Sequence, residues 1–146
     1  MPMYSKPSGL VKALNNRIMP FLLSLGLPLS GAHVLTVRGR KSGEPRAVTV
    51  NLLDHDGARY LVAPRGDTEW VRNLRAAGEG ELRLGSKRDA FRATEIGDAE
   101  KPPVIRHYLE RWGTVTRREF GVGKDPTDEE LQRLSPDHPV FRITSS

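Results

Sequence analysis

A basic turn flanked by two glycines holds the densest set of ligand-binding residue types in this chain. It runs from Arg38 to Arg46 with the sequence Arg-Gly-Arg-Lys-Ser-Gly-Glu-Pro-Arg. Gly39 and Gly43 permit backbone conformations with positive φ and leave amide N–H groups open to a ligand. A phosphate or carboxylate here could accept several charge-assisted hydrogen bonds, each contributing on the order of 1.5–3 kcal/mol when partly desolvated. The turn taken alone is equally compatible with a solvated loop whose charges keep a strand edge soluble.

A second turn, Ala63-Pro64-Arg65-Gly66-Asp67, favours the binding interpretation. It ends an apolar strand pattern and opens a helical one, so Arg65 and a helix N-terminus offer positive potential together. Trp70 follows one turn later and could lie against a planar ring, or it could be an ordinary core tryptophan. The role of Asn73 is equally undecided, since its side-chain amide could bind a ligand or could hydrogen-bond to a backbone group of the sheet.

The composition excludes several other kinds of site. The 146-residue chain is most simply one domain, residues 1–146, with a loose tail over residues 1–8. It has no cysteine, and its four histidines show no metal-ligand spacing, so no metal site is expected. The net charge of +5 favours an anionic partner. Only nine aromatic residues accompany 23 basic ones, which argues against a nucleic-acid surface.

The elements that must position the two turns are mainly strands. Apolar and β-branched patterns predict strands over residues 33–38, 45–53, 58–63, 81–84, 88–96 and 138–144. Asp56-Gly57 is a strong hairpin signal between the second and third of them. About six short strands, mostly antiparallel and joined by tight turns, indicate a small barrel in an α+β chain that is mainly β.

Four helices complete the expected fold. Apolar spacing predicts an amphipathic helix over residues 9–25, whose basic face could pack on its own domain or touch membrane lipid. A helix over residues 68–77 should follow the third strand, with Gly78 marking its end. Two C-terminal helices are predicted over residues 101–112 and 125–134. No signal peptide is visible and no apolar run approaches the roughly 20 residues of a membrane span, so a cytoplasmic, possibly membrane-associated protein is expected.

The two turns together resemble a known family. Gly39-Arg40-Lys41-Ser42-Gly43-Glu44-Pro45-Arg46, Asp56-Gly57, Arg65-Gly66 and Trp70-Val71-Arg72-Asn73-Leu74-Arg75-Ala76 are similar to motifs of the deazaflavin-dependent nitroreductase family, of split β-barrel fold. This resemblance implies binding of coenzyme F420, which carries a phosphate and an oligoglutamate tail, and transfer of its hydride to an organic acceptor. The residues that it assigns to the coenzyme are Arg40, Lys41, Ser42, Arg46, Val48, Thr49, Ala63, Pro64, Arg65, Trp70 and Asn73.

The resemblance also divides those residues by role. The phosphate and tail would lie at the first turn, the ring along Val48 and Thr49, and its polar edge near residues 63–65, with Trp70 and Asn73 closing the pocket. Two departures bear on the acceptor. Pro64-Arg65-Gly66 stands where relatives often have Ser-Lys-Gly, and Tyr108 is the one tyrosine of the C-terminal region. These departures argue against nitroimidazole reduction. Quinones, enones and nitro-type compounds are the acceptor classes that the resemblance implies, and no catalytic residue is assigned.

Two other classes of function stay open at this point. One is a split-barrel protein that uses FMN or merely stores a cofactor. The other is a basic domain that binds nucleic acid or lipid. The expected partner of the reductase is a small-molecule hydride acceptor. The protein itself is expected to be a monomer or a homodimer.

Overall fold

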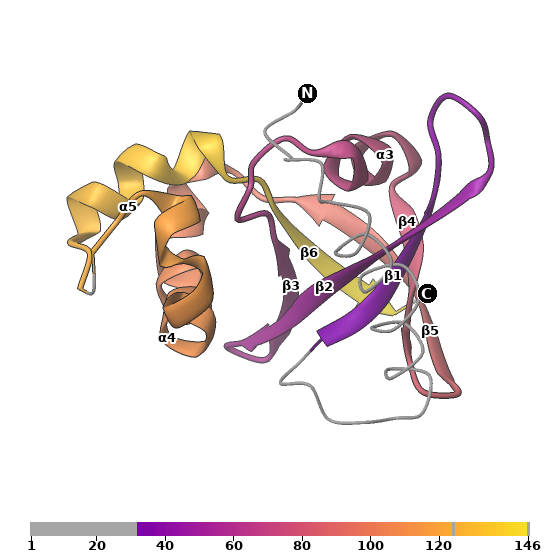
Figure 1. The fold of residues 1–146 in the computed structure, drawn as a ribbon, viewed down its shortest axis with the longest axis horizontal. Coiled ribbons are helices and arrows are strands. Elements are labelled where there is room, and N and C mark those ends of the chain that lie inside the picture. Colours follow the sequence, from indigo (N-terminus) through magenta and orange to yellow (C-terminus); the bar gives the residue numbers. More distant parts are fainter. Residues whose placement is uncertain (1–31, 124, 146) are drawn as a thin grey trace, which may run out of the picture.

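The computed structural model describes residues 32–123 and 125–145, apart from the side chains of residues 114 and 115. Six antiparallel strands close a barrel in the order β1-β2-β3-β6-β5-β4 (Figure 1). Their bounds are Ala32–Arg38, Pro45–His55, Ala58–Val62, Glu79–Leu84, Lys87–Glu95 and Val140–Ser145 for β1 to β6. The predicted mainly β barrel is confirmed, and every predicted strand is present within a few residues of its expected ends.

Alternating side chains fill the barrel. Leu35 and Val37 of β1 point inward, as do Leu61 of β3 and Phe141 of β6, and all four are buried in one cluster. Val50 and Leu52 pack against this cluster, which agrees with the period of two in β2. Helix α3, Glu69–Ala77, covers one end of the barrel and buries Val71 and Leu74 in the same cluster (Figure 1). The barrel and α3 therefore share one apolar interior.

Strand β2 is longer than the strand that follows it, and this opens the barrel wall. Its residues 45–51 pair with β1, whereas its residues 52–55 pair with β3. The hairpin-closing bond from Gly39 N to Glu44 O measures 2.8 Å. Because bonded and non-bonded pairs alternate in an antiparallel ladder, the backbone groups of Ala47 and Thr49 must face away from β1. Within the described ranges no strand pairs with that edge.

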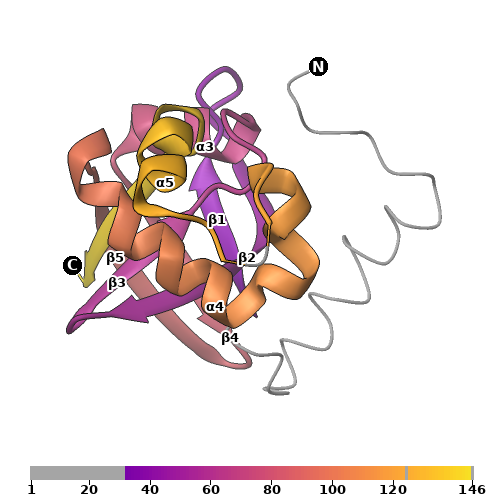
Figure 2. The ribbon, with the colours of Figure 1, turned by 90° about the vertical axis from the view of Figure 1, so that its left-hand side faces the viewer.

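A second layer lies outside the barrel. Helix α4, Lys101–Phe120, and helix α5, Asp128–Leu134, pack beside β2, β3 and β6 (Figure 2). Two short 3-10 turns, η2 at Asp98–Glu100 and η3 at Ser135–Asp137, lead into α4 and out of α5. A second buried cluster joins this layer to the barrel strands. Its members are Leu53, Val62, Val104, Ile105, Tyr108, Leu109, Trp112, Phe120, Leu131, Leu134 and Val140.

The expected end of α4 at Trp112 is wrong, because the helix continues through Gly113 to Phe120. A glycine inside a helix costs only about 1 kcal/mol, and burying Phe120 against Tyr108 outweighs that cost. Gly121 then ends the helix in the left-handed conformation, with φ of 71°. Helix α5 starts later than predicted, since Thr127 and Glu130 form a capping box at its N-terminus.

Two predictions about the N-terminus concern residues that the structure does not describe. The helix over residues 9–25 and the tail over residues 1–8 lie outside the described residues, as does any lipid contact of that helix. Among the helices that are described, none is long and apolar enough to cross a membrane.

Candidate cofactor site

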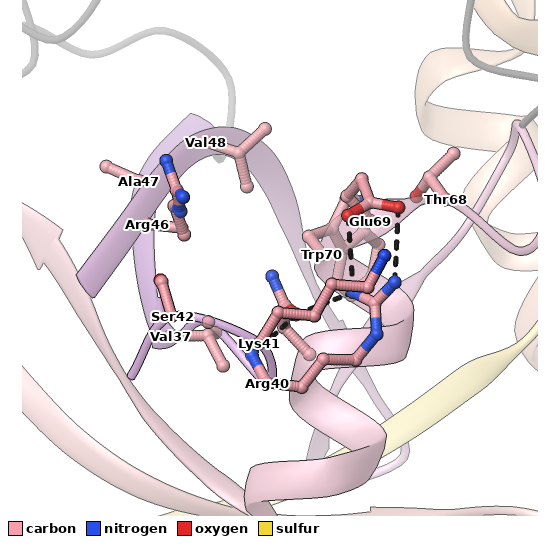
Figure 3. A pocket seen from close by; sticks show the side chains of 12 residues that line it. Val37, Arg40, Lys41, Ser42, Arg46, Ala47, Val48, Thr68, Glu69 and Trp70 are labelled. Atoms are coloured by element: carbon pink, nitrogen blue, oxygen red, sulfur yellow. Dashed lines mark hydrogen bonds and ion pairs between the residues drawn. The ribbon is translucent and has the colours of Figure 1, made fainter. Parts of the chain in front are cut away.

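A cavity of about 450 Å³ lies between the β1–β2 hairpin and the N-terminal half of α3 (Figure 3). One wall carries Arg46, Ala47 and Val48 of β2, and the facing wall carries Thr68, Glu69 and Trp70. The hairpin turn closes the cavity with Arg40, Lys41 and Ser42. The first turn that the sequence singled out therefore meets the start of the helix that follows the second turn.

The hairpin turn needs both of its glycines, for two different reasons. Gly43 has a positive φ of 76°, as expected. Gly39 does not, but a Cβ there would lie 3.0 Å from Ser42 Oγ and 3.2 Å from the Glu44 carbonyl oxygen. Ser42 Oγ accepts a hydrogen bond of 3.1 Å from the Glu44 N–H, which fixes the turn. Gly39 therefore does not use the conformational freedom of glycine, and what the turn requires at this position is the absence of a side chain.

Arg40 and Asn73 join the turn to α3. Asn73 is buried, and its Oδ1 accepts hydrogen bonds from Arg40 N at 3.1 Å and Arg40 Nη1 at 2.8 Å. The same guanidinium donates to Glu69 at 3.2 Å, and this bond lowers the pKa of the Glu69 carboxyl. Both residues line the cavity, but their polar groups are engaged with each other. Their main structural effect is to hold the basic turn against the helix.

Lys41 and Arg46 differ from Arg40 in this respect. Both are exposed at the cavity, and neither forms an ion pair or a side-chain hydrogen bond with another described residue. Figure 3 shows them on different sides of the cavity, Lys41 on the turn and Arg46 on β2. Lys41 lies near enough to Glu69 to help lower the pKa of that carboxyl, but neither cation forms a salt bridge with a described residue, so both add positive potential at the cavity mouth. This is where an anionic group would gain most.

Two threonine hydroxyls near the site have no hydrogen-bond partner among the described residues. They are Thr49 Oγ1 and Thr68 Oγ1, and both are shielded from solvent. Thr68 is the N-cap residue of α3, yet its side chain does not cap the helix. A buried hydroxyl without a partner costs roughly 1–3 kcal/mol. A polar ligand edge that reached these hydroxyls would remove that cost.

A second cavity, of about 420 Å³, adjoins the first, and Ala47, Val48, Thr68 and Trp70 border both. Val48 is 36% exposed, although it is a large apolar side chain. Trp70 is half-buried and lies 6.1 Å from the ring of Phe141, so it serves both the core and the cavities. The core interpretation of Trp70 is therefore confirmed, and its contact with a planar ring stays a prediction. A flat ring could lie where the two cavities meet.

The second cavity runs along β2 to the outer helices. Tyr108 of α4 lines it, and the Asn51 side-chain amide donates to the Tyr108 hydroxyl at 3.4 Å. Burial raises the pKa of Tyr108 to about 12, against a smaller opposing effect of the Asn51 hydrogen bond. The phenol is therefore neutral at physiological pH and keeps a proton to donate. Tyr108 belongs to the buried cluster of the outer layer, and it also lines this cavity.

The second turn contributes less directly than expected. Pro64 and Arg65 line the second cavity, where the Arg65 Nε donates a short hydrogen bond to the Glu119 carboxylate of α4. Ala63 lines neither of these two cavities and is only 1% exposed. Its N–H donates to the Pro139 carbonyl at 2.9 Å, so that N–H is not available to a ligand. Ala63 is a core residue that fixes the turn.

Comparison with known proteins decides the family. The sequence matches the family described as F420H(2)-dependent quinone reductase over residues 16–127, most of the chain. This chain belongs to that family. It is therefore an F420-dependent oxidoreductase, in agreement with the resemblance noted in its motifs. A search of curated proteins found no match.

Solved structures agree with the quinone reductase family in fold. One described as an F420-H2 dependent reductase is 19% identical, with a TM-score of 0.57, and the match covers 78% of this chain and 94% of that one. A protein of unknown function from Agrobacterium tumefaciens is 18% identical, with a TM-score of 0.59, over 99% of this chain and 59% of that one. A structure described as a domain-swapped dimer is 20% identical, with a TM-score of 0.57, over 95% of this chain and 100% of that one.

The residues present fit the coenzyme of this family. The exposed cations Lys41 and Arg46 suit its anionic groups, and the hydroxyls of Thr49 and Thr68, which have no hydrogen-bond partner in the described part of the chain, suit a polar ring edge. Sequence reasoning missed Thr68, because an N-cap threonine normally caps its own helix. It also missed Asn51, which nothing marks until β2 and α4 are placed side by side.

Proposed function

We propose that this chain binds reduced F420 across the two adjoining cavities and passes its hydride to a quinone-type acceptor in the second one. The observation that carries the proposal is the pair of exposed cations, Lys41 and Arg46, that line the first cavity and form no salt bridge with a described residue. They would hold the phosphate and the oligoglutamate tail, assisted by Ser42. Such contacts are charge-assisted, and the ligand's several negative charges match the chain's net charge of +5.

The ring of the coenzyme would lie at the boundary between the cavities. Val48 and Trp70 supply apolar surface there, and the outward backbone edge at Ala47 and Thr49 supplies hydrogen-bonding groups. The side chains of Thr49 and Thr68 add two more. When bound, the reduced deazaflavin supplies a hydride and is left oxidised by two electrons. The chain's own residues then act by holding the two reactants within transfer distance.

The acceptor would occupy the second cavity, whose walls include Tyr108, Thr116 and Glu119. Reduction of a quinone adds a hydride and a proton, so negative charge develops on a carbonyl oxygen. The neutral Tyr108 hydroxyl, held by Asn51, can donate a hydrogen bond to that oxygen. Solvent supplies the proton that completes the quinol. A neutral acceptor suits this cavity because its two charged side chains, Arg65 and Glu119, neutralise each other.

The test is a fluorescence titration of the protein with oxidised F420. Wild type is expected to bind the coenzyme at micromolar concentration, and the Lys41→Ala/Arg46→Ala double variant at least roughly 30-fold more weakly. Lys87→Ala/Arg88→Ala is the matched control, since it removes the same charges from the start of β5, away from both cavities. This control should bind like wild type.

Two results would contradict the assignment. Retained affinity in the Lys41/Arg46 variant would remove the proposed tail site. Tighter binding of FMN than of F420 in the same titration would favour the alternative of an FMN-binding split barrel. Turnover of a soluble naphthoquinone with reduced F420 then tests the acceptor class directly.

The chain is also proposed to work as one domain that can pair with a second copy. The support is the solved structure described as a domain-swapped dimer, which has the same fold over its whole length. Size-exclusion chromatography with light scattering distinguishes a monomer from a homodimer.

A further inference from the structure

Two histidines that are 52 positions apart in sequence come together on the outer side of the barrel. His55 ends β2 and His107 lies in the first half of α4. Their Nδ1 atoms are 3.0 Å apart, and the ring centroids are 5.1 Å apart with planes at 60°. Nδ1 atoms this close share one proton, so one imidazole donates and the other accepts.

Both rings are held by rigid elements. The β2–β3 hairpin pairs His55 with Ala58, and the Tyr60 ring packs edge-on against His55 at 6.2 Å. His107 is half-buried on α4, and the next residue, Tyr108, is buried in the cluster between the outer helices and the barrel. The pair is therefore positioned by the fold and does not depend on a mobile loop.

The pair borders a cavity of about 580 Å³ that opens to solvent between β2, α4 and α5. The charged side chains that line it are Arg106, Glu110 and Asp128. Arg106 donates to Asp128 at 2.6 Å, so these two charges offset each other. Glu110 follows His107 by one helical turn and lines the same cavity, which leaves negative charge beside the imidazoles.

We propose that His55 and His107 form a two-histidine chelate for a divalent transition metal, which fastens the end of β2 to α4. Neutral imidazole is a preferred ligand of Zn²⁺, Cu²⁺ and Ni²⁺. Within the described ranges no group of three or more histidine and acidic side chains is arranged to hold a metal. The two imidazoles thus supply the protein ligands, and water completes the coordination.

The geometry selects among these metals. With metal–nitrogen bonds of about 2.0–2.1 Å, the separation of 3.0 Å gives an N–metal–N angle of about 95°. This is close to the right angle of square-planar and octahedral sites, which Cu²⁺ and Ni²⁺ adopt. A tetrahedral Zn²⁺ site would require the nitrogens to separate by a few tenths of an ångström. Ni²⁺ is therefore the probe of choice, since it also avoids redox chemistry.

The experiment is isothermal titration of the full chain, freed of any histidine tag, with Ni²⁺, together with thermal unfolding. Wild type should bind one Ni²⁺ at micromolar concentration, with Tm rising by roughly 3–5 °C at saturation. His55→Ala and His107→Ala should each lose both effects. His33→Ala, which removes a histidine from β1, should keep them. His107→Gln retains a hydrogen-bonding side chain without a good ligand, so it separates loss of metal binding from loss of folding.

Two outcomes would overturn the site. One is unchanged Ni²⁺ binding in both His55→Ala and His107→Gln. The other is a wild type that binds no Ni²⁺ below millimolar concentration. Mg²⁺, which prefers oxygen ligands, should leave Tm unchanged in all variants.

Discussion

At the scale of single residues, the basic side chains around the cavities fall into two groups. Arg40 and Arg65 form salt bridges with acidic residues on helices, Glu69 and Glu119, whereas Lys41 and Arg46 form none with a described residue. An arginine already paired to a carboxylate gains less from a second anion, because its charge is partly neutralised. We therefore expect residues of the same charge in these two turns to have different roles, with Arg40 and Arg65 fixing the site and Lys41 and Arg46 binding its ligand.

Thr68→Val tests the unpartnered hydroxyl directly. The substitution removes a buried polar group that has no partner and that caps nothing. The coenzyme-free protein should therefore gain about 1 kcal/mol in free energy of unfolding, measured by urea denaturation. Coenzyme affinity should fall by roughly 10-fold, because the ligand loses a hydrogen bond.

Thr116→Val is the matched comparison for stability. The Thr116 hydroxyl donates to the Trp112 carbonyl at 2.8 Å, so its removal should bring no gain. If Thr68→Val destabilised the free protein as much as Thr116→Val or more, the Thr68 hydroxyl would have a structural partner after all.

Tyr108→Phe should lower kcat/KM for a naphthoquinone by roughly 100-fold, the usual effect of removing one donor to a developing oxyanion. The dissociation constant of F420 should not change, because Tyr108 borders only the second of the two adjoining cavities. Since burial raises the pKa of Tyr108 to about 12, the wild-type rate should show no ionisation of this phenol at neutral or mildly alkaline pH. A variant with wild-type kcat/KM would show that Tyr108 serves only the core.

At the scale of elements, two glycines outside the site test how closely the strands and helices pack. A Cβ at Gly113 of α4 would meet its nearest neighbour at 3.6 Å, an ordinary contact. A Cβ at Gly80 of β4 would lie 2.9 Å from the Thr36 carbonyl oxygen and 3.0 Å from the Phe91 ring. Gly113→Ala should therefore stabilise the protein by about 0.5–1 kcal/mol, and Gly80→Ala should destabilise it by about 1–3 kcal/mol.

Thermal or urea unfolding of the two variants measures whether each substitution raises or lowers the free energy of unfolding. A loss of stability in Gly113→Ala would mean that α4 needs a bend at that position. Tolerance of Gly80→Ala would mean that β1 and β5 yield more easily than these short distances indicate.

Most elements could be predicted from local pattern, and the exceptions have physical causes. The strands could be predicted from the alternation of apolar and polar residues, as at Val50 and Leu52. The turn at Asp56-Gly57 could be predicted from its residue types. Helix α4 could not be followed past Gly113, because a sequence shows the cost of the glycine but not the burial of Phe120 that offsets it. Boundaries set by tertiary packing are invisible to local propensity.

The site could be predicted only in part, for the same reason. The turn around Lys41 and the helix that begins near Trp70 were identified by motif, and the structure brings them to one cavity. The sequence did not show that Ala63 is closed off in the core, that Arg65 pairs with Glu119, or that His55 meets His107. Each of these depends on contacts between residues far apart along the chain.

At the scale of the whole molecule, His138 joins the barrel to the outer helices. Its Nδ1 lies 3.1 Å from the Ala63 carbonyl, and its ring lies 4.4 Å from that of Phe120 at the end of α4. The charged groups that act on it are Asp137 and Lys101. Burial lowers the pKa of His138, although the hydrogen bond to Ala63 opposes that effect. The folded protein therefore keeps this imidazole neutral.

This lowered pKa makes the folded state sensitive to acid. The ordinary pKa of a histidine is 6.5. As pH falls below this value, His138 binds a proton in the unfolded chain more readily than in the folded chain, so the free energy of unfolding decreases. His138→Asn keeps an N–H donor for Ala63 but cannot titrate. Urea unfolding at neutral pH and at a pH below 6.5 should show a smaller loss for this variant than for wild type. Equal losses in both proteins would assign the acid sensitivity to other groups.

The open half of β2 also has a consequence for solubility. A strand edge with unused N–H and C=O groups is a template on which a strand of another molecule can add. At this edge Pro45 lacks an N–H, and the exposed charge of Arg46 discourages approach. A ligand that occupied the backbone groups of Ala47 and Thr49 would close the same edge. If the coenzyme binds as proposed, its binding and intermolecular strand addition would be mutually exclusive at this edge, and the coenzyme would protect the barrel from aggregation.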